Sequence, residues 1–326
     1  MSVSRSTNAE TAGPAGRTPP GMMAIPGGTF AMGSEHFYPE EAPVRKVSVD
    51  PFWMDETPVT NAQFAEFVEA TGHVTFAEIP PDPEDYPDML AELAQPGSLV
   101  FEKTQGPVDL SSGAVPWWHF RLGAYWREPL GPGSSIEGLE DHPVVHVAHG
   151  DADAYAKWAG KQLPTEAEWE FAAKGGTDGA EYAWGDELAP DGAMLANYWQ
   201  GRFPYANTEE DGWLRTSPVK AYPANGYGLY DMIANVWEWT SDWFEMPKVE
   251  RKRRGSCCIP SNPRGGTREG SIFKGDPSRI PRRVLKGGSH LCAEDYCQRY
   301  RPAARYAQPV DTTTSHVGFR CIMRKC

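Results

Sequence analysis

The chain has 326 residues, of which 40% are hydrophobic and 12% aromatic, and it contains 12 tryptophans. This composition excludes a disordered chain, while 33 glycines and 30 prolines favour short elements joined by many turns over long helices. The formal net charge of -13 argues against a nucleic-acid partner, because phosphate binding needs a basic face.

The first twenty residues are polar and lack the apolar segment of a secretory signal. We predict that 1–20 form a flexible N-terminal lead and that 21–326 form the folded domain. No run of about 18 apolar residues occurs, so we expect no membrane span and a cytoplasmic location. In a reducing compartment structural disulfides are uncommon, so adjacent Cys257 and Cys258 are predicted to be free thiols in a loop.

Short strands are predicted at both ends of the folded part. The apolar segments 22–26 and 29–33 and the alternating segment 46–50 predict strands near the N-terminus, and 316–323 predicts a final strand. Residues 78–138 have no clear period and many prolines. A segment of this kind is a surface insertion or a functional loop.

Three segments have helical spacing or helix-capping residues. The first helix should follow Thr60 and end at Gly72, which stands where a C-cap belongs. A second is predicted to begin with Asp151 as its N-cap. Thr165 and Glu168 match the capping box of a third.

Oxygen-bearing side chains gather between residues 196 and 243. The two clusters are Asn197 with Asp211, and Asp231 with Asn235 and Glu238. Hard cations such as Ca²⁺ bind carboxylate, amide and backbone oxygens in irregular loops, so both clusters are candidate sites. Taken alone, the residues of each cluster are more typical of ordinary turn capping.

Two of the six cysteines, Cys292 and Cys297, stand five residues apart in the segment 287–301. This offset is about 140° around a helix and reaches opposite faces of a strand, so the thiols meet only if the chain turns between them. Residues 293–295 can form such a turn, and Gly287-Gly288 allows unusual dihedral angles. Facing thiols can form a redox disulfide or bind a soft metal, although a structural disulfide or two inert core cysteines fit the spacing as well.

Nearby cations favour the thiolate form of these cysteines. Arg299, Arg301 and Arg305 follow the pair closely in the sequence. A positive charge beside a thiol stabilises the thiolate, which is the reactive and metal-binding form.

A set of short motifs along the chain resembles the sulfatase-modifying-factor superfamily. They are Gly27-Gly28-Thr29-Phe30-x-Met32-Gly33, Pro58-Val59-Thr60-Asn61-x-x-Phe64, Leu163-Pro164-Thr165-Glu166-Ala167-Glu168-Trp169-Glu170, Asn225-Gly226-x-Gly228-Leu229-Tyr230-Asp231-Met232, Asn235-Val236-Trp237-Glu238-Trp239 and Gly318-Phe319-Arg320. The resemblance extends from about Met22 to Met323. It implies the α+β fold class: a single mixed domain with little regular secondary structure, similar to C-type lectins.

The segment Lys286-Gly287-Gly288-Ser289-x-x-Cys292-x4-Cys297-x-Arg299-Tyr300-Arg301 is similar to the active-site segment of formylglycine-generating enzymes. Such enzymes convert the cysteine of a C-x-P-x-R motif in an unfolded sulfatase polypeptide to Cα-formylglycine, using O2 and a thiol reductant. The resemblance implies that Cys292 and Cys297 bind Cu(I). Paired thiolates are soft ligands that select Cu(I), and a substrate thiolate can join them.

Motif positions imply further site residues. Ser289, Tyr296 and Trp237 match pocket positions near copper, substrate cysteine and oxygen, and Arg301 matches a pocket arginine. The implied ligands of a first structural Ca²⁺ ion are Asn197, Tyr198, Asp211 and Trp213, and those of a second are Asp231, Ala234, Val236 and Glu238. His316 stands where many relatives carry asparagine.

Two other functions fit parts of this resemblance. An iron-dependent sulfoxide synthase of the superfamily usually adds an N-terminal helical domain with a His-rich iron motif, whereas the motifs here begin near Met22. A noncatalytic binding module on the lectin-like fold would not need the paired cysteines.

Overall fold

The computed structural model describes residues 17–83, 85–86, 89–247 and 259–324. The first sixteen residues of the predicted lead, the adjacent Cys257 and Cys258, and Cys326 lie outside the described residues. Across the ranges that are described, no helix combines the length and apolar character needed to cross a membrane.

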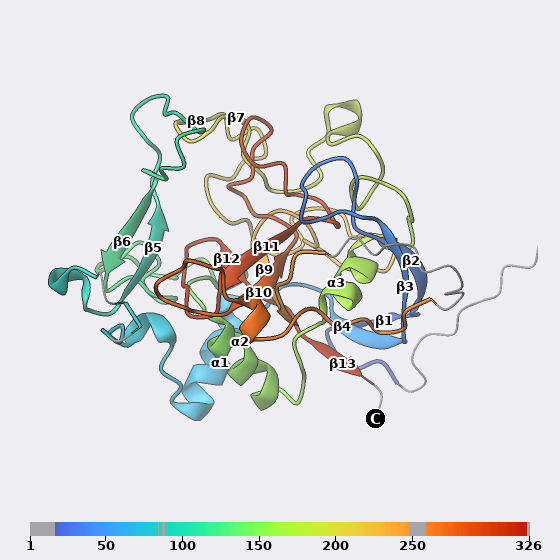
Figure 1. Ribbon diagram of the computed structural model, residues 1–326, viewed down its shortest axis with the longest axis horizontal. Helices are drawn as coiled ribbons and strands as arrows, with labels where there is room; N and C mark the ends of the chain where they lie inside the picture. Colours follow the sequence, from blue (N-terminus) through green and yellow to red (C-terminus); the bar gives the residue numbers. More distant parts are fainter. Residues whose placement is uncertain (1–16, 84, 87–88, 248–258, 325–326) are drawn as a thin grey trace, which may run out of the picture.

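A four-stranded sheet in the order β11-β10-β9-β12 occupies the middle of the molecule (Figure 1). Its strands are β9 (Trp237–Trp243), β10 (Arg282–Lys286), β11 (Arg305–Pro309) and β12 (Val317–Gly318). β10 is antiparallel to both neighbours, with Lys286 opposite Glu238, and β12 is parallel to β9, with Val317 opposite Trp237. This register brings the start of β9, the end of β10 and the residue before β12 together at the same end of the sheet.

The other strands form smaller sheets around this centre. β4 (Phe52–Asp55) pairs with β1 (Met22–Ile25) and β13 (Ile322–Arg324), while β2 (Gly28–Met32) pairs with β3 (Arg45–Val49). The two remaining pairs are β5 (Gly97–Phe101) with β6 (Trp118–Leu122) and β7 (Gly201–Arg202) with β8 (Ala206–Asn207). The N-terminal strands are confirmed, but β1 and β2 each pair with a later strand rather than with each other.

Two of the predicted helices have the expected caps. α1 (Asn61–Thr71) begins after Thr60, whose side chain accepts from Gln63 N, and ends at Gly72 in the left-handed conformation. α3 (Glu166–Ala173) begins with the predicted capping box of Thr165 and Glu168. Short 3-10 helices are η1 (Phe76–Glu78), η2 (Ala91–Leu93), η3 (Pro190–Gly192) and η4 (Glu269–Ser271).

The predicted start of the second helix is wrong. α2 (His149–Trp158) begins two residues before Asp151, and Ala148 occupies the N-cap position. The Asp151 carboxylate lies in the first turn and accepts a hydrogen bond from Ala148 N at 2.9 Å. A carboxylate at the third helical position accepts a hydrogen bond from the backbone N–H of the N-cap residue. Asp151 therefore indicates that a helix begins nearby, but it is not the N-cap itself.

The segment 78–138 contains a β-hairpin that was not predicted. β5 and β6 pair from Gly97 opposite Leu122 to Phe101 opposite Trp118. In β6 the half-buried Trp118 and Phe120 alternate with the exposed His119 and Arg121. The sequence therefore carries a short strand pattern, which was missed because the longer segment around it has no clear period.

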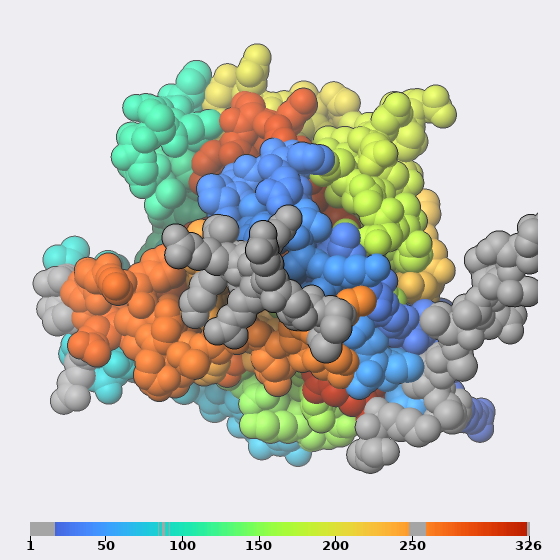
Figure 2. Space-filling model, turned by 45° about the vertical axis from the view of Figure 1, so that its right-hand side comes forward, coloured from blue at the N-terminus to red at the C-terminus, as the bar shows by residue number. Residues whose placement is uncertain are grey.

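Segments far apart in the chain also meet at the surface. Ser48 N donates to Pro260 O at 2.9 Å, and Asn262 N donates to Ser48 O at 2.7 Å. Figure 2 shows the orange segment that contains these later residues beside the blue N-terminal strands. The N-terminal strands are thus joined to the second half of the chain.

Several buried charged side chains form ion pairs. In α3, Glu170 Oε2 lies 2.8 Å from Lys286 Nζ, and Glu166 Oε1 lies 2.6 Å from Arg305 Nε. In β9, Glu238 Oε1 lies 2.8 Å from Arg320 Nη2. Since an unpaired buried charge costs several kcal/mol, these pairs fix how the elements can pack.

We expect Arg320→Met to lower the free energy of unfolding by about 3 to 5 kcal/mol, because it leaves Glu238 buried without its cation. Urea unfolding measures this change. The matched control is Lys157→Met, which removes the exposed pair with Asp153 and should change stability by less than about 1 kcal/mol. Equal losses for the two variants would contradict the structural role of the buried pair.

Candidate active site

The predicted glycine turn leads from the central sheet into the site. After β10, Gly287 and Gly288 have φ angles of 91° and 76°, a region that residues with a side chain rarely adopt. A Cβ atom on Gly288 would lie 2.4 Å from the carbonyl oxygen of Arg299. No other residue therefore fits here, and the turn sends the following segment back across the end of the sheet.

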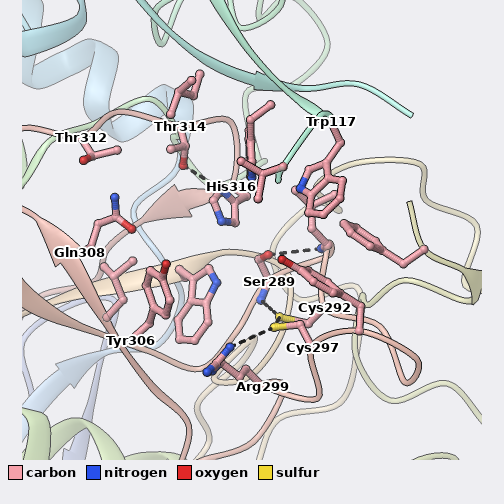
Figure 3. A pocket seen from close by; sticks show the side chains of 18 residues that line it. Trp117, Ser289, Cys292, Cys297, Arg299, Tyr306, Gln308, Thr312, Thr314 and His316 are labelled. Atoms are coloured by element: carbon pink, nitrogen blue, oxygen red, sulfur yellow. Dashed lines mark hydrogen bonds between the residues drawn. The ribbon is translucent and has the colours of Figure 1, made fainter. Parts of the chain in front are cut away.

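The two cysteines meet across a turn, as predicted. Cys297 N donates to Ala293 O at 2.8 Å, and the two sulfur atoms lie 3.3 Å apart (Figure 3). Both thiols are free. Ser289 N also donates to Cys292 Sγ at 3.5 Å. The segment therefore presents two sulfur atoms close enough to share one proton or one soft metal ion.

The two thiols differ in acidity. The hydrogen bond with Cys292 and the charge of Arg299 lower the pKa of Cys297 to about 7. Burial raises the pKa of Cys292 well above its ordinary value. Above about pH 7 the pair therefore holds one negative charge, on Cys297, with the Cys292 thiol as hydrogen-bond donor.

Arg299 is the cation beside this charge. Its Nη1 donates to Cys297 Sγ at 3.8 Å, while its Nη2 lies 2.6 Å from Glu40 Oε1. The guanidinium lies 3.8 Å from the ring centre of Tyr38, and the Tyr38 hydroxyl accepts from Gln298 N. Sequence reasoning missed Tyr38 and Glu40, because nothing in their local pattern connects them to cysteines some 260 positions later.

Arg301, the predicted pocket arginine, does not line the active-site cavity. It is fully buried, pairs with Glu41 at 2.6 Å and lies 3.5 Å from the ring centre of Phe37. Arg299 faces the sulfur atoms instead, with its Nη1 3.8 Å from Cys297 Sγ. Arg301 fixes the N-terminal loop to the site.

The cavity around the sulfur atoms has a volume of about 270 Å³. Ser289, Tyr296 and Trp237, three of the predicted site residues, line it. The β5–β6 hairpin contributes Leu99, Trp117 and Trp118, β11 contributes Tyr306 and Gln308, and the segment before β12 contributes Thr312, Thr314 and His316 (Figure 3). None of its 18 lining residues is Asp or Glu, so the chain's negative charge lies elsewhere.

Aromatic rings form one wall. Tyr296 stacks on Phe203 with ring centres 4.4 Å apart and meets Trp117 edge-on at 5.4 Å. Burial, followed by the charge of Cys297, raises the pKa of Tyr296 to about 12. Its hydroxyl therefore stays protonated at neutral pH and can donate a hydrogen bond.

His316 lies across the cavity from the sulfur atoms (Figure 3). Its ring packs 4.7 Å from that of Trp118, and its Nδ1 lies 2.7 Å from Thr314 Oγ1. Burial lowers the pKa of His316 well below its ordinary value, so the imidazole is neutral. It adds a hydrogen-bonding group without charge.

The first predicted calcium set contains an uncompensated carboxylate. Burial raises the pKa of Asp211, whose Oδ1 accepts from Trp213 N at 3.0 Å. Its Oδ2 and the Tyr222 hydroxyl are buried and interact with each other, and within the described residues neither has a hydrogen bond to a third group. Asn197, also buried, donates its amide to Arg215 O at 2.8 Å. These groups fit a hard cation that would satisfy the free oxygens.

The second set fits a cation less well. Burial raises the pKa of Asp231 to about 6, and Asp231 and Ala234 have positive φ angles. Glu238, however, already accepts hydrogen bonds from Arg320 and from Trp169 Nε1. Tyr198 of the first set is buried, as are Ala234 and Val236 of the second.

Fold and cavity together define a mixed α+β protein that holds two free thiols in an aromatic pocket without carboxylates. The chain belongs to the sulfatase-modifying factor enzyme 1-like domain family, whose model matches residues 8–325. The predicted resemblance is thereby confirmed.

Named relatives agree with this assignment. The chain is 53% identical over 301 residues to the formylglycine-generating enzyme of Mycobacterium tuberculosis, covering 92% of this chain and 97% of that protein. It is 46% identical to that of Streptomyces coelicolor, covering 95% and 91%. The solved structure of PvdO from Pseudomonas aeruginosa has a TM-score of 0.61 at 20% identity, over 93% of this chain and 94% of that one, which confirms the fold class alone.

In the metal-free, reduced protein, the rate at which Cys297 reacts with iodoacetamide should rise with pH, with its midpoint near pH 7. The rate increases with pH because the thiolate is the reactive form, and its fraction increases as the pH rises through the lowered pKa of Cys297. Cys292 should react slowly throughout this range. Peptide mass spectrometry after timed labelling measures each rate.

Arg299→Gln should move the midpoint for Cys297 to higher pH, because it removes the cation beside the sulfur. The matched control is Arg202→Gln, an exposed arginine, which should leave the midpoint unchanged. A midpoint that stays near 7 without Arg299 would show that this cation does not set the acidity.

Proposed function

We propose that this enzyme converts the cysteine of a C-x-P-x-R motif in an unfolded sulfatase polypeptide to Cα-formylglycine, using O2 and a small thiol reductant. The observation that carries the proposal is the pair of free thiols 3.3 Å apart at an aromatic cavity. The support from relatives is the 53% identity to a protein named for this product.

The donor set fits Cu(I). Two sulfur ligands select a soft monovalent metal, and one of the two thiols loses its proton near neutral pH. Within the described part of the chain, no group of three or more His, Cys, Asp or Glu side chains could hold a metal ion. Cys292 and Cys297 would therefore hold copper with room for the substrate sulfur. When bound, copper would supply the one-electron chemistry toward O2 that side chains lack.

The chain's own residues prepare this site. Arg299 stabilises the charge on Cys297 through its hydrogen bond, and Glu40 holds Arg299 in place. The Tyr296 hydroxyl remains protonated and can donate a hydrogen bond to oxygen or to the substrate. Trp117 and Trp237 line the cavity and limit the access of water to the sulfur atoms.

The cavity is suited to an extended peptide. Its volume of about 270 Å³ accepts a few side chains, so the surface of a folded protein could not bring a cysteine to the sulfur pair. The motif proline removes a backbone donor and favours an extended or turn conformation. We expect processing of the sulfatase only before it folds.

The motif arginine would meet neutral groups. No carboxylate lines the cavity, so an ion pair with the motif arginine is not available there. The side-chain oxygens of Gln308 and Thr312 can accept hydrogen bonds from a guanidinium, and the rings of Trp118 and Tyr306 can stack on it. An arginine-to-lysine change in the peptide should therefore recover only part of the activity.

The test is mass spectrometry of a C-x-P-x-R peptide incubated with the protein, Cu(I), O2 and a thiol. The expected product has lost the sulfur and two hydrogens of the cysteine and gained one oxygen. Cys292→Ser and Cys297→Ser should each lower turnover by at least a hundredfold with no loss of fold by circular dichroism. Cys321→Ala, which changes the other free thiol in the described ranges, should retain turnover.

Near-normal turnover in either serine variant with copper present would disprove the two-thiol site. Metal content after purification under reducing conditions separates the proposal from the other two functions. Copper supports it, whereas iron would favour a sulfoxide synthase and no metal a noncatalytic module.

We also propose that the first calcium set, around Asp211, binds Ca²⁺ as a structural ion. EGTA should then lower Tm by several degrees, because an ion bound to the native state alone stabilises it by about 2.7 kcal/mol at a hundredfold excess over Kd. Asp211→Asn should abolish this sensitivity, whereas Asp153→Asn, at an exposed carboxylate, should retain it. Unchanged melting with EGTA would rule the ion out.

A further inference from the structure

A second cavity of about 150 Å³ lies behind one wall of the active site. Ser315 lines it, whereas the neighbouring Thr314 and His316 line the active-site cavity. Its walls come from 126–145 and the start of α1, and they are largely apolar, with Trp126, Leu130, Ile136, Leu139, Pro143 and Val145. The cavity is thus a separate apolar compartment that shares one chain segment with the active site.

One cation lines this compartment without a partner. The side chain of Arg215 is half-buried and makes no hydrogen bond or ion pair with any residue of the described ranges. The nearest carboxylate that affects it belongs to Glu102, which is already paired with Arg121. Burial without an anion is unfavourable for a guanidinium and lowers the pKa of Arg215.

A second polar group there is also unsatisfied. Asn61 lines the cavity, and its side chain is 4% exposed. Its amide donates to Leu139 O at 2.8 Å, but its Oδ1 has no hydrogen-bond partner within the described part of the protein. The cavity therefore combines a free cation, a free acceptor and an apolar interior.

We propose that this cavity binds a small organic carboxylate. The guanidinium of Arg215 matches the two oxygens of a carboxylate, with which arginine forms paired hydrogen bonds. The apolar walls match an aliphatic or single-ring body, whereas an inorganic anion would lose its hydration against them without compensation. A hydroxyl on the aliphatic or ring body of the ligand would satisfy Asn61 Oδ1. This inference does not depend on the proposed activity.

Benzoate serves as the probe, and benzamide is its neutral counterpart of the same shape. At constant ionic strength, millimolar benzoate should raise Tm by a few degrees and give saturable binding by calorimetry, whereas benzamide and inorganic phosphate should do neither. Equal shifts with benzoate and benzamide, or with benzoate and phosphate, would overturn the proposal.

Arg215→Gln should raise the Kd for benzoate at least tenfold. Because Arg215 lacks a partner in the described residues, this change should not destabilise the free protein. Arg202→Gln, at an exposed arginine, should bind benzoate as the unchanged protein does. If Arg215→Gln does not fold, a crystal structure of the unchanged protein with benzoate tests the proposal. The benzoate carboxylate should then lie at the Arg215 guanidinium, and any other position would overturn the proposal.

Discussion

The ion pair between Lys286 and Glu170 is the constraint on which the site depends. Both side chains are buried, the charged atoms lie 2.8 Å apart, and the amine also donates to Ala303 O. Because a buried charge is stable only when paired, the end of β10 must lie against α3. The glycine turn begins at the next residue, so this pair sets where Cys292 enters the cavity.

A second group of ion pairs joins the N-terminal loop to the same segment. Glu40 and Glu41 are adjacent, yet they pair with Arg299 and Arg301, two residues apart on the segment after the cysteines. One pair places a cation at Cys297, and the other is buried and structural. The acidity of a cysteine near the C-terminus therefore depends on a loop near the N-terminus.

The distribution of charge matters more than its total. The chain carries a net charge of -13, but no carboxylate lines the active-site cavity. Among the described residues that line the second cavity, Arg215 is the one arginine, and there is no lysine. A pocket without carboxylates favours soft-metal chemistry at sulfur, because no hard oxygen ligand competes for the metal. The same absence means that a basic substrate side chain would be recognised by rings and neutral oxygens.

The sequence by itself determined the family and those structural features whose interactions span only a few residues. Thr60 and Thr165 cap helices through hydrogen bonds to the third residue after them, and Gly288 permits a turn that excludes a side chain. The turn that Cys292 and Cys297 need in order to meet also lies within one short segment. Each of these interactions has both partners within one short segment, so a local pattern contains it.

Only the tertiary structure decided which polar groups are satisfied. Arg299 rather than Arg301 faces the sulfur atoms, because Glu41 and Phe37 hold Arg301 in the core. Arg215 remains without a partner in the described part of the chain, because Glu102 is paired elsewhere. Such outcomes depend on partners a hundred or more positions away, and packing selects among them by the cost of burying an unpaired charge.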